Sequence, residues 1–209
     1  MQSITQYFLR QLLPTLYGQL TRLLYNGSNL SIGTGFKCEG IPRILIDRSA
    51  VINIGNDVYL RRNVEIRAHG QSSIHIGNQI RLDRSIRILS SNQSKVSIGN
   101  GSRIGLNTVI NGGDDISVGE NVLISGFVYL QSSMHNHQKN ESINQQGYSH
   151  KPIQLADDVW IGAHVTILPG ISLPKGTVIG SNAVMTSSPT KEYTVWAGVP
   201  AREIKERTT

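Results

Sequence analysis

The chain has 209 residues, of which 38% are hydrophobic but only 6% aromatic, and it contains 21 glycines. This length suits one substantial domain with a small appendage, and the composition excludes a disordered chain and a core built on aromatic side chains. Twenty Lys and Arg against fourteen Asp and Glu give a net charge of +6, which suits an anionic ligand. Because the basic residues are scattered and no aromatic platform accompanies them, we expect no nucleic-acid partner.

Cys38 is the only cysteine, which excludes an internal disulfide framework and predicts a small buried side chain. No stretch reaches the ~18 consecutive apolar residues of a membrane span, and the N-terminus lacks the pattern of a cleaved secretory leader. The sequence therefore predicts a cytoplasmic protein.

Leucines recur at three- and four-residue spacing over residues 3–26, which predicts an amphipathic helix, broken or kinked at Pro14. Asn26-Gly27 ends it, so residues 1–27 form the predicted N-terminal unit. The apolar stripe consists of Leu9, Leu12, Leu13, Leu16, Tyr17, Leu20, Leu23 and Leu24.

Two interpretations of this helix stay open. It covers the open end of the repetitive structure that follows, or it lies on a membrane surface as an interfacial anchor. We favour the cover, because the polar face carries only Arg10 and Arg22 as cations.

From residue 28 onward an aliphatic-x-aliphatic-Gly pattern repeats. It ends at Gly33, Gly55, Gly77, Gly99 and Gly119, with steps of 22, 22, 22 and 20 residues. Later, Ile161-Gly162 and Ile179-Gly180 are 18 residues apart, which is three times six. Such regularity over most of a chain is typical of a solenoid.

A six-residue period runs within the repeats. Val159, Val165, Ile171 and Thr177 form one series, and Ile161, Ile167, Leu173 and Ile179 form another. Two inward-facing series predict short strands separated by tight turns, with three hexads to a triangular coil and extra residues at the corners of longer coils. We expect positive φ at glycine, Asn or Asp in corners such as Gly55-Asn56-Asp57, Gly77-Asn78 and Gly99-Asn100-Gly101.

This pattern resembles the hexapeptide-repeat acyltransferases over about residues 28–206. Two segments sharpen the match: NVLISGFVYLQSSMH (121–135), and DDVWIGAHVTILPGISLPKGTVIGSNAVMT (157–186) followed by VWAGVPAREIKE (195–206). The segment nearer the C-terminus is similar to the C-terminal coils and tail of the galactoside, maltose and polysaccharide O-acetyltransferases.

The resemblance implies an all-β solenoid, a left-handed parallel β-helix over residues 28–206 with a short C-terminal tail, assembled as a homotrimer. It implies an O-acetyltransferase with acetyl-CoA as co-substrate and no metal. The acceptor would be a sugar hydroxyl of a surface polysaccharide precursor or a small glycoside.

A polar loop over residues 134–152 interrupts the repeats, and in the family such an insertion carries the catalytic histidine. Acetyl transfer to a hydroxyl needs a base that holds a proton near neutral pH, which suits histidine. His135 matches the family position and is the predicted base, and His137 is the next choice. His150 and His164 are weaker candidates, and packing or a subunit contact is the simpler interpretation of His164.

The resemblance also implies two sets of binding residues. Asn111, Asp114 and Asp115 stand where the family often places acceptor-binding groups, although an ordinary corner of the coil explains them equally well. The coenzyme A candidates are Trp160, Ala163, Ser181, Thr186, Arg202 and Lys205. Trp160 would line the acyl site or pack between subunits, and Arg202 would contact phosphate or solvent.

One departure from the family concerns the phosphates. Many relatives read Thr-Lys-Asp where this chain reads Thr186-Ser187-Ser188-Pro189. Phosphate binding therefore rests on Arg202 and Lys205, with Lys191 as a substitute for the missing lysine.

Other functions compete with this one. Within the transferases, the acceptor could instead be the amine of an amino sugar, or the hydroxyl of serine or of an antibiotic. A zinc-dependent lyase similar to γ-type carbonic anhydrases could take two ligands from His135-x-His137, but no third histidine stands at a convincing position. A non-catalytic binding solenoid would leave the histidine-bearing loop without a purpose, and no glycine-rich nucleotide-binding domain precedes the repeats.

Overall fold

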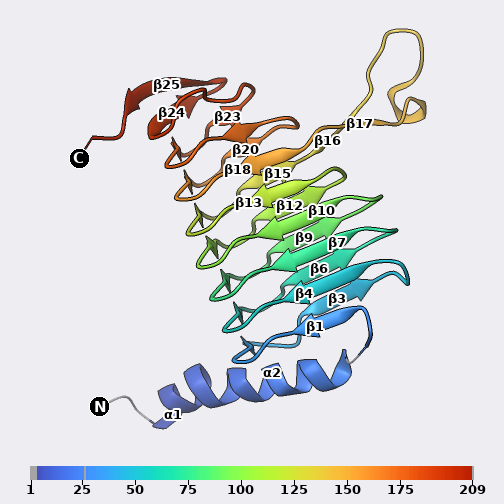
Figure 1. Cartoon of the computed structure of the whole chain (residues 1–209), viewed down its shortest axis with the longest axis vertical. Coiled ribbons are helices and arrows are strands. Elements are labelled where there is room, and N and C mark those ends of the chain that lie inside the picture. Colours follow the sequence, from blue (N-terminus) through green and yellow to red (C-terminus); the bar gives the residue numbers. More distant parts are fainter. Residues whose placement is uncertain (1–3, 26, 209) are drawn as a thin grey trace.

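The computed structural model describes residues 4–25 and 27–208. Most of them form a parallel β-solenoid of about seven turns (Figure 1). This confirms the predicted all-β, left-handed parallel β-helix fold. Each turn adds one strand to each of three sheets, which we name A, B and C.

The strands alternate between these sheets in chain order. Sheet A holds β1 (Leu30–Ile32), β4 (Val51–Ile54), β7 (Ser73–Ile76), β10 (Lys95–Ile98), β13 (Ile116–Val118), β18 (Ile153–Leu155) and β21 (Ser172–Leu173). Sheet B holds β2 (Lys37–Cys38), β5 (Tyr59–Leu60), β8 (Arg81–Leu82), β11 (Arg103–Ile104), β14 (Leu123–Ile124), β19 (Trp160–Ile161), β22 (Val178–Ile179), β24 (Thr194–Gly198) and β25 (Ala201–Glu206). Sheet C holds β3 (Arg43–Ile46), β6 (Glu65–Ala68), β9 (Arg87–Ser90), β12 (Val109–Gly112), β15 (Tyr129–Gln131), β20 (Thr166–Ile167) and β23 (Val184–Met185).

The core consists of aliphatic columns that run along the solenoid. In sheet A, Ile52, Ile74, Val96, Ile116 and Ile153 are register partners in successive strands, and all are fully buried. The residues between them along each strand point outward, as in a half-buried strand. Cys38 is buried in the same core, as predicted.

The corners use glycine for a different reason from the one we expected. Among the expected corner residues, Asp57 and Gly101 have positive φ, but the repeating glycines such as Gly55 and Gly77 do not. A Cβ atom on Gly55 would lie 2.7 Å from the carbonyl oxygen of Gly77 in the next turn. Close approach of successive turns, and not positive φ, therefore requires the repeating glycine.

Asparagine side chains join the turns at the same corner. The side-chain oxygen of Asn78 accepts a hydrogen bond from the backbone N–H of Asn56, and Asn100 does the same for Asn78, both at 2.8 Å. The extra residues of the 22-residue turns do not lie at corners: they lengthen the strands of sheets A and C, which have four residues in β6 and β7 but two in β20 and β21.

A helix crosses the N-terminal end of the solenoid (Figure 1). It comprises α1 (Ile4–Tyr7), a π-helical segment η1 (Phe8–Leu12) and α2 (Leu13–Leu24), and residues 1–3 and Asn26 lie outside the described residues. The π-helical segment ends two residues before Pro14, whose ring has no N–H to continue the ordinary hydrogen-bond pattern. Within the described part of the chain, no helix combines the length and the hydrophobicity that crossing a membrane requires.

The columns predict that stability is lost where an inward side chain is shortened. Ile74→Ala should lower the free energy of unfolding by about 2–5 kcal/mol, because the neighbouring turns cannot collapse into the space. His75→Ala, on the outward side of the same strand, should change it by less than ~0.5 kcal/mol. Urea denaturation followed by circular dichroism measures both, and equal losses would contradict the assigned register.

Candidate active site

An antiparallel hairpin leaves the solenoid between sheets C and A. It consists of β16 (Ser133–His135) and β17 (Tyr148–His150), with the 3-10 turn η2 (Ile143–Gln145) near its tip. The backbone N–H of Lys151 donates to the carbonyl of Ser132 at 3.0 Å, which closes the base of the excursion. Figure 1 shows the hairpin projecting away from the stacked turns.

His135 lies at the end of β16 on the exposed hairpin. Its ring faces the ring of Tyr148, its register partner, with centroids 4.2 Å apart and a 37° tilt. The Nδ1 atom of His137 lies 3.2 Å from the carbonyl oxygen of His135, so His137 is engaged with the hairpin backbone. The Tyr148 ring contacts the ring of His135 and also stacks on that of His150, with centroids 6.2 Å apart.

His150 occupies the foot of the hairpin. Its Nδ1 atom forms a 2.8 Å hydrogen bond with the Ser133 hydroxyl. Gly113 lies directly beneath, since a Cβ atom there would be 1.9 Å from that hydroxyl oxygen. His150 thus fixes where the hairpin leaves the solenoid.

A surface groove of about 560 Å³ lies beside this foot. His150, Asp114 and Asp115 contribute to its wall. The Asp115 carboxylate also accepts a hydrogen bond from the backbone N–H of Lys95 at 2.7 Å, and the Asp114 carboxylate accepts one from the N–H of Asp115. Both aspartates therefore stabilise the corner of the coil through hydrogen bonds to backbone N–H groups.

Asn111 lies on the outer face of sheet C, one turn from the hairpin. Its side-chain N–H donates to the Gln131 side-chain oxygen at 2.6 Å, which also accepts from the Tyr129 hydroxyl. Gln131 in turn donates to the carbonyl of Ser133 at the start of β16. Asn111 is thus connected to the hairpin through one glutamine.

The coenzyme A candidates lie mainly on sheet B. Trp160, Val178, Val195 and Lys205 are register partners in four neighbouring strands. Since strands are spaced by ~4.8 Å, the Trp160 and Lys205 positions are ~14 Å apart on one outward column. Trp160 is 50% exposed, and its indole N–H points to the Ser125 hydroxyl at 3.4 Å.

The other candidates lie in three places. Ala163 and Ser181 lie in consecutive turns at the corner between sheets B and C, where the Asn182 N–H donates to the Ala163 carbonyl at 2.8 Å. Arg202 is exposed on β25 beside this column and donates to the carbonyl of Ala201. Thr186 follows β23 of sheet C, so the structure does not bring it to the Trp160 column. Lys191 pairs with Glu206 at 3.5 Å.

An aromatic pair at the sheet B–C corner was not identified from the sequence. The rings of Phe127 and His164 stack with centroids 4.7 Å apart and an 8° interplanar angle. Both residues have positive φ, 59° and 58°, where the same corner carries Asn107 and Asn182 in other turns. The signal available in the sequence was this replacement of Asn by an aromatic residue at a corner position.

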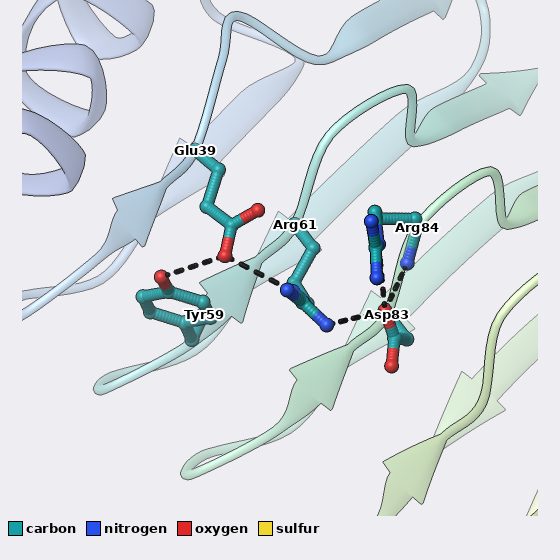
Figure 2. A network of polar contacts seen from close by, with 5 residues as sticks. All are labelled: Glu39, Tyr59, Arg61, Asp83 and Arg84. Atoms are coloured by element: carbon teal, nitrogen blue, oxygen red, sulfur yellow. Dashed lines mark hydrogen bonds and ion pairs between the residues drawn. The ribbon is translucent and has the colours of Figure 1, made fainter. Parts of the chain in front are cut away.

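A charged cluster occupies sheet B nearer the helix. Figure 2 shows the Glu39 carboxylate between the Tyr59 hydroxyl and Arg61, and Asp83 between Arg61 and Arg84. The hydrogen bond from Arg61 to Glu39 raises the pKa of that guanidinium, and burial together with Glu39 raises the pKa of Tyr59. Because the charges pair within the cluster, we assign it a structural role.

Within the described residues, no group of three or more His, Cys, Asp or Glu side chains is arranged to hold a metal ion.

No protein-family model matches the chain. In sequence, the chain is similar to the galactoside O-acetyltransferase of Escherichia coli (strain K12), with 37% identity over 91 residues, which cover 44% of this chain and 44% of that protein. The chain spans between about a third and a half of the length of the curated relatives that it matches.

In structure, the chain is similar to the polysialic acid O-acetyltransferase OatWY, with a TM-score of 0.57 and 19% identity over 85% of this chain and 88% of that chain. It is also similar to a variant of AntD, an N-acyltransferase from Bacillus cereus in complex with dTDP-4-amino-4,6-dideoxyglucose and coenzyme A, with a TM-score of 0.60 and 20% identity over 91% and 90% of the two chains. The chain has the left-handed β-helix fold, and over 44% of its length its sequence is similar to O-acetyltransferases. The resemblance inferred from its hexads and C-terminal segments is confirmed.

The hydrogen bond to Lys95 predicts a structural effect of Asp115. Asp115→Ala should lower the free energy of unfolding by about 1 kcal/mol, whereas Asp115→Asn keeps an acceptor oxygen and should retain most of it. Urea denaturation measures both. A fully stable Asp115→Ala variant would contradict the corner role and return Asp115 to the acceptor-binding candidates.

Proposed function

We propose that this hexapeptide-repeat protein is an acetyl-CoA-dependent O-acetyltransferase that acts on a sugar hydroxyl. The observation that carries the proposal is the placement of His135 on a hairpin that interrupts an otherwise regular β-helix. Similarity to a galactoside O-acetyltransferase in sequence and to acyltransferases in fold supports the reaction class. A surface polysaccharide precursor or a glycoside is the acceptor we favour.

In this mechanism His135 acts as the general base. The neutral imidazole takes the proton of the acceptor hydroxyl while the oxygen attacks the thioester carbonyl carbon. The resulting oxyanion collapses, the carbon–sulfur bond breaks, and the imidazolium returns the proton to the leaving thiolate. The ring of Tyr148, tilted against that of His135, restricts its orientation, so we propose Tyr148 as a positioning residue.

The two halves of the proposed site lie on different parts of one chain. The hairpin emerges where sheet C meets sheet A, whereas Trp160 and Lys205 lie on sheet B, the third side of the triangular coil. A site that contains both halves therefore needs two copies, the hairpin of one lying against sheet B of the next. We propose a homotrimer, because a cyclic head-to-tail arrangement closes such contacts.

Coenzyme A would lie along the outward column of sheet B. Trp160 would contact the acyl end, and Lys205 and Arg202 the phosphates, with the corner of Ala163 and Ser181 alongside. The ~14 Å between Trp160 and Lys205 suits a long ligand with its anionic groups at one end. Thr186 and Lys191 have no place in this arrangement.

The base assignment predicts a selective loss of turnover. His135→Ala should lower kcat/KM by ~100-fold or more, because no group then accepts the hydroxyl proton. His137→Ala is the matched control and should retain activity within a few-fold. Thiol release from acetyl-CoA and product mass, measured over sugars, amino sugars and small hydroxyl compounds, give both values and identify the acceptor.

Several outcomes of this assay would overturn the assignment. Full activity in His135→Ala together with loss in His137→Ala moves the base along the hairpin. Product formed only from amino sugars, serine or an antibiotic changes the acceptor class. No turnover, combined with stoichiometric zinc in the purified protein, would favour the lyase.

The shared site predicts complementation between inactive variants. Co-expressed His135→Ala and Arg202→Glu/Lys205→Glu chains should recover up to about a quarter of wild-type activity, since random mixing makes a quarter of the interfaces fully wild type. Lys95→Glu, a charge reversal on sheet A, is the control and should retain activity alone. Mixed chains that are no more active than the average of the two variants would show that one chain supplies the whole site.

A further inference from the structure

The N-terminal helix turns its apolar face away from the solenoid. The residues buried against the first turn are Pro14, Gly18 and Thr21. A Cβ atom on Gly18 would lie 2.4 Å from the carbonyl oxygen of Phe36, so the helix backbone lies directly on the solenoid. The outward face is formed by exposed leucines: Leu9, Leu12, Leu16, Leu20 and Leu23.

The polar groups of the helix explain this orientation. The first turn of a β-solenoid ends in unpaired backbone groups, which need hydrogen-bonding partners. The Arg22 guanidinium donates to the carbonyls of Ile32 and Gly33, and Lys37 donates to the Gln11 side chain at 3.4 Å. Because these contacts use the polar side, the leucines are left on the far side.

The exposed face is too large to be incidental. From Leu9 to Leu23 the helix rises ~21 Å, and Leu16 and Leu23 are 54% and 75% exposed. Monomeric proteins rarely leave such a continuous apolar surface in water, and a helix with one apolar face is suited to the boundary between lipid headgroups and acyl chains.

Charge distinguishes a lipid surface from a second copy of the chain. The first 38 residues contain Arg10, Arg22 and Lys37 but no Asp or Glu. A neighbouring groove of about 720 Å³ is lined by four cationic side chains, including Arg10, Lys37 and Arg81, against the two acids Glu39 and Asp83. Two copies meeting through their helices would bring these like charges together, whereas anionic headgroups would attract them.

We propose that the leucine face of the N-terminal helix binds the surface of an anionic membrane. The helix lies across the end of the solenoid (Figure 1), so the solenoid would stand upright on the bilayer with the hairpin raised above it. The helix covers the end of the solenoid with its polar side, while its apolar face remains available for the membrane. The proposal does not depend on acetyl transfer.

Vesicle cosedimentation of the full chain tests the proposal. Wild type should bind vesicles of phosphatidylcholine with about one third phosphatidylglycerol, and bind pure phosphatidylcholine more weakly. Leu16→Ser/Leu20→Ser removes apolar area without changing charge and should weaken binding by about ten-fold or more. Gln11→Asn, an uncharged change on the polar side of the same helix, is the control and should retain most of the binding.

Light scattering and a thermal melt accompany the binding assay. The double serine variant should keep the oligomeric state and melting temperature of wild type, because both leucines are exposed. If the wild-type protein binds neither kind of vesicle, the proposal is wrong. If the wild type does not bind vesicles and the serine variant forms a smaller oligomer, the leucine face is a contact between copies of this chain. Turnover of a water-soluble acceptor is measured separately, so failure of the transferase assignment cannot mimic either result.

Discussion

Each turn of this solenoid must lie on the turn before it with its backbone hydrogen bonds and its aliphatic columns aligned at once. The register pairs from Ile52 through Ile116 to Ile153 satisfy both conditions, although the last step spans the whole hairpin. At the corners where successive turns are in contact, a side chain in place of glycine would push the turns apart. For this reason the repeating corner glycines are fixed by contact with the next turn, and irregular segments must leave the coil outward.

The same stacking leaves two ends with unpaired strand edges, and the chain treats them differently. At the C-terminal end, β25 folds back antiparallel on β24 and extends sheet B. At the N-terminal end, the helix uses Arg22 to occupy carbonyls at the end of β1. A cationic, hydrogen-bonding side is thus fixed on the solenoid, and the position of the leucines follows from it. The leucine face is exposed because the opposite side of the helix forms the hydrogen bonds to the first turn of the solenoid.

The sequence predicted what is periodic. The spacing of Ile32-Gly33 and its successors indicated the coil, and the hexads around Val159 indicated which side chains face inward. The hairpin strands have no such period, so β16 and β17 were expected only as a polar loop. Amphipathicity of residues 3–26 indicated that the helix has an apolar side but not which side meets the solenoid, because that depends on hydrogen bonds to residues 32 and 33. Phe127 and His164 stand out in the sequence as aromatic residues at corner positions, but their stacking joins different turns of the coil, which a local pattern does not show.

The candidate site shows the same division between local and distant information. His135 could be chosen because its strand, loop and residue type are adjacent in sequence, and Trp160 because it stands in a recognisable segment. Their separation onto the hairpin and sheet B follows from the order of the three sheets, which fixes the side of the coil on which each strand lies. Since the coil core between these sides is filled with aliphatic side chains, one chain cannot bring the two residues together by a local movement. A reaction that needs both a hairpin base and a sheet B cofactor column therefore makes association of the chains a condition of catalysis. The same association would shield the exposed ring of His135 from water where it meets the thioester.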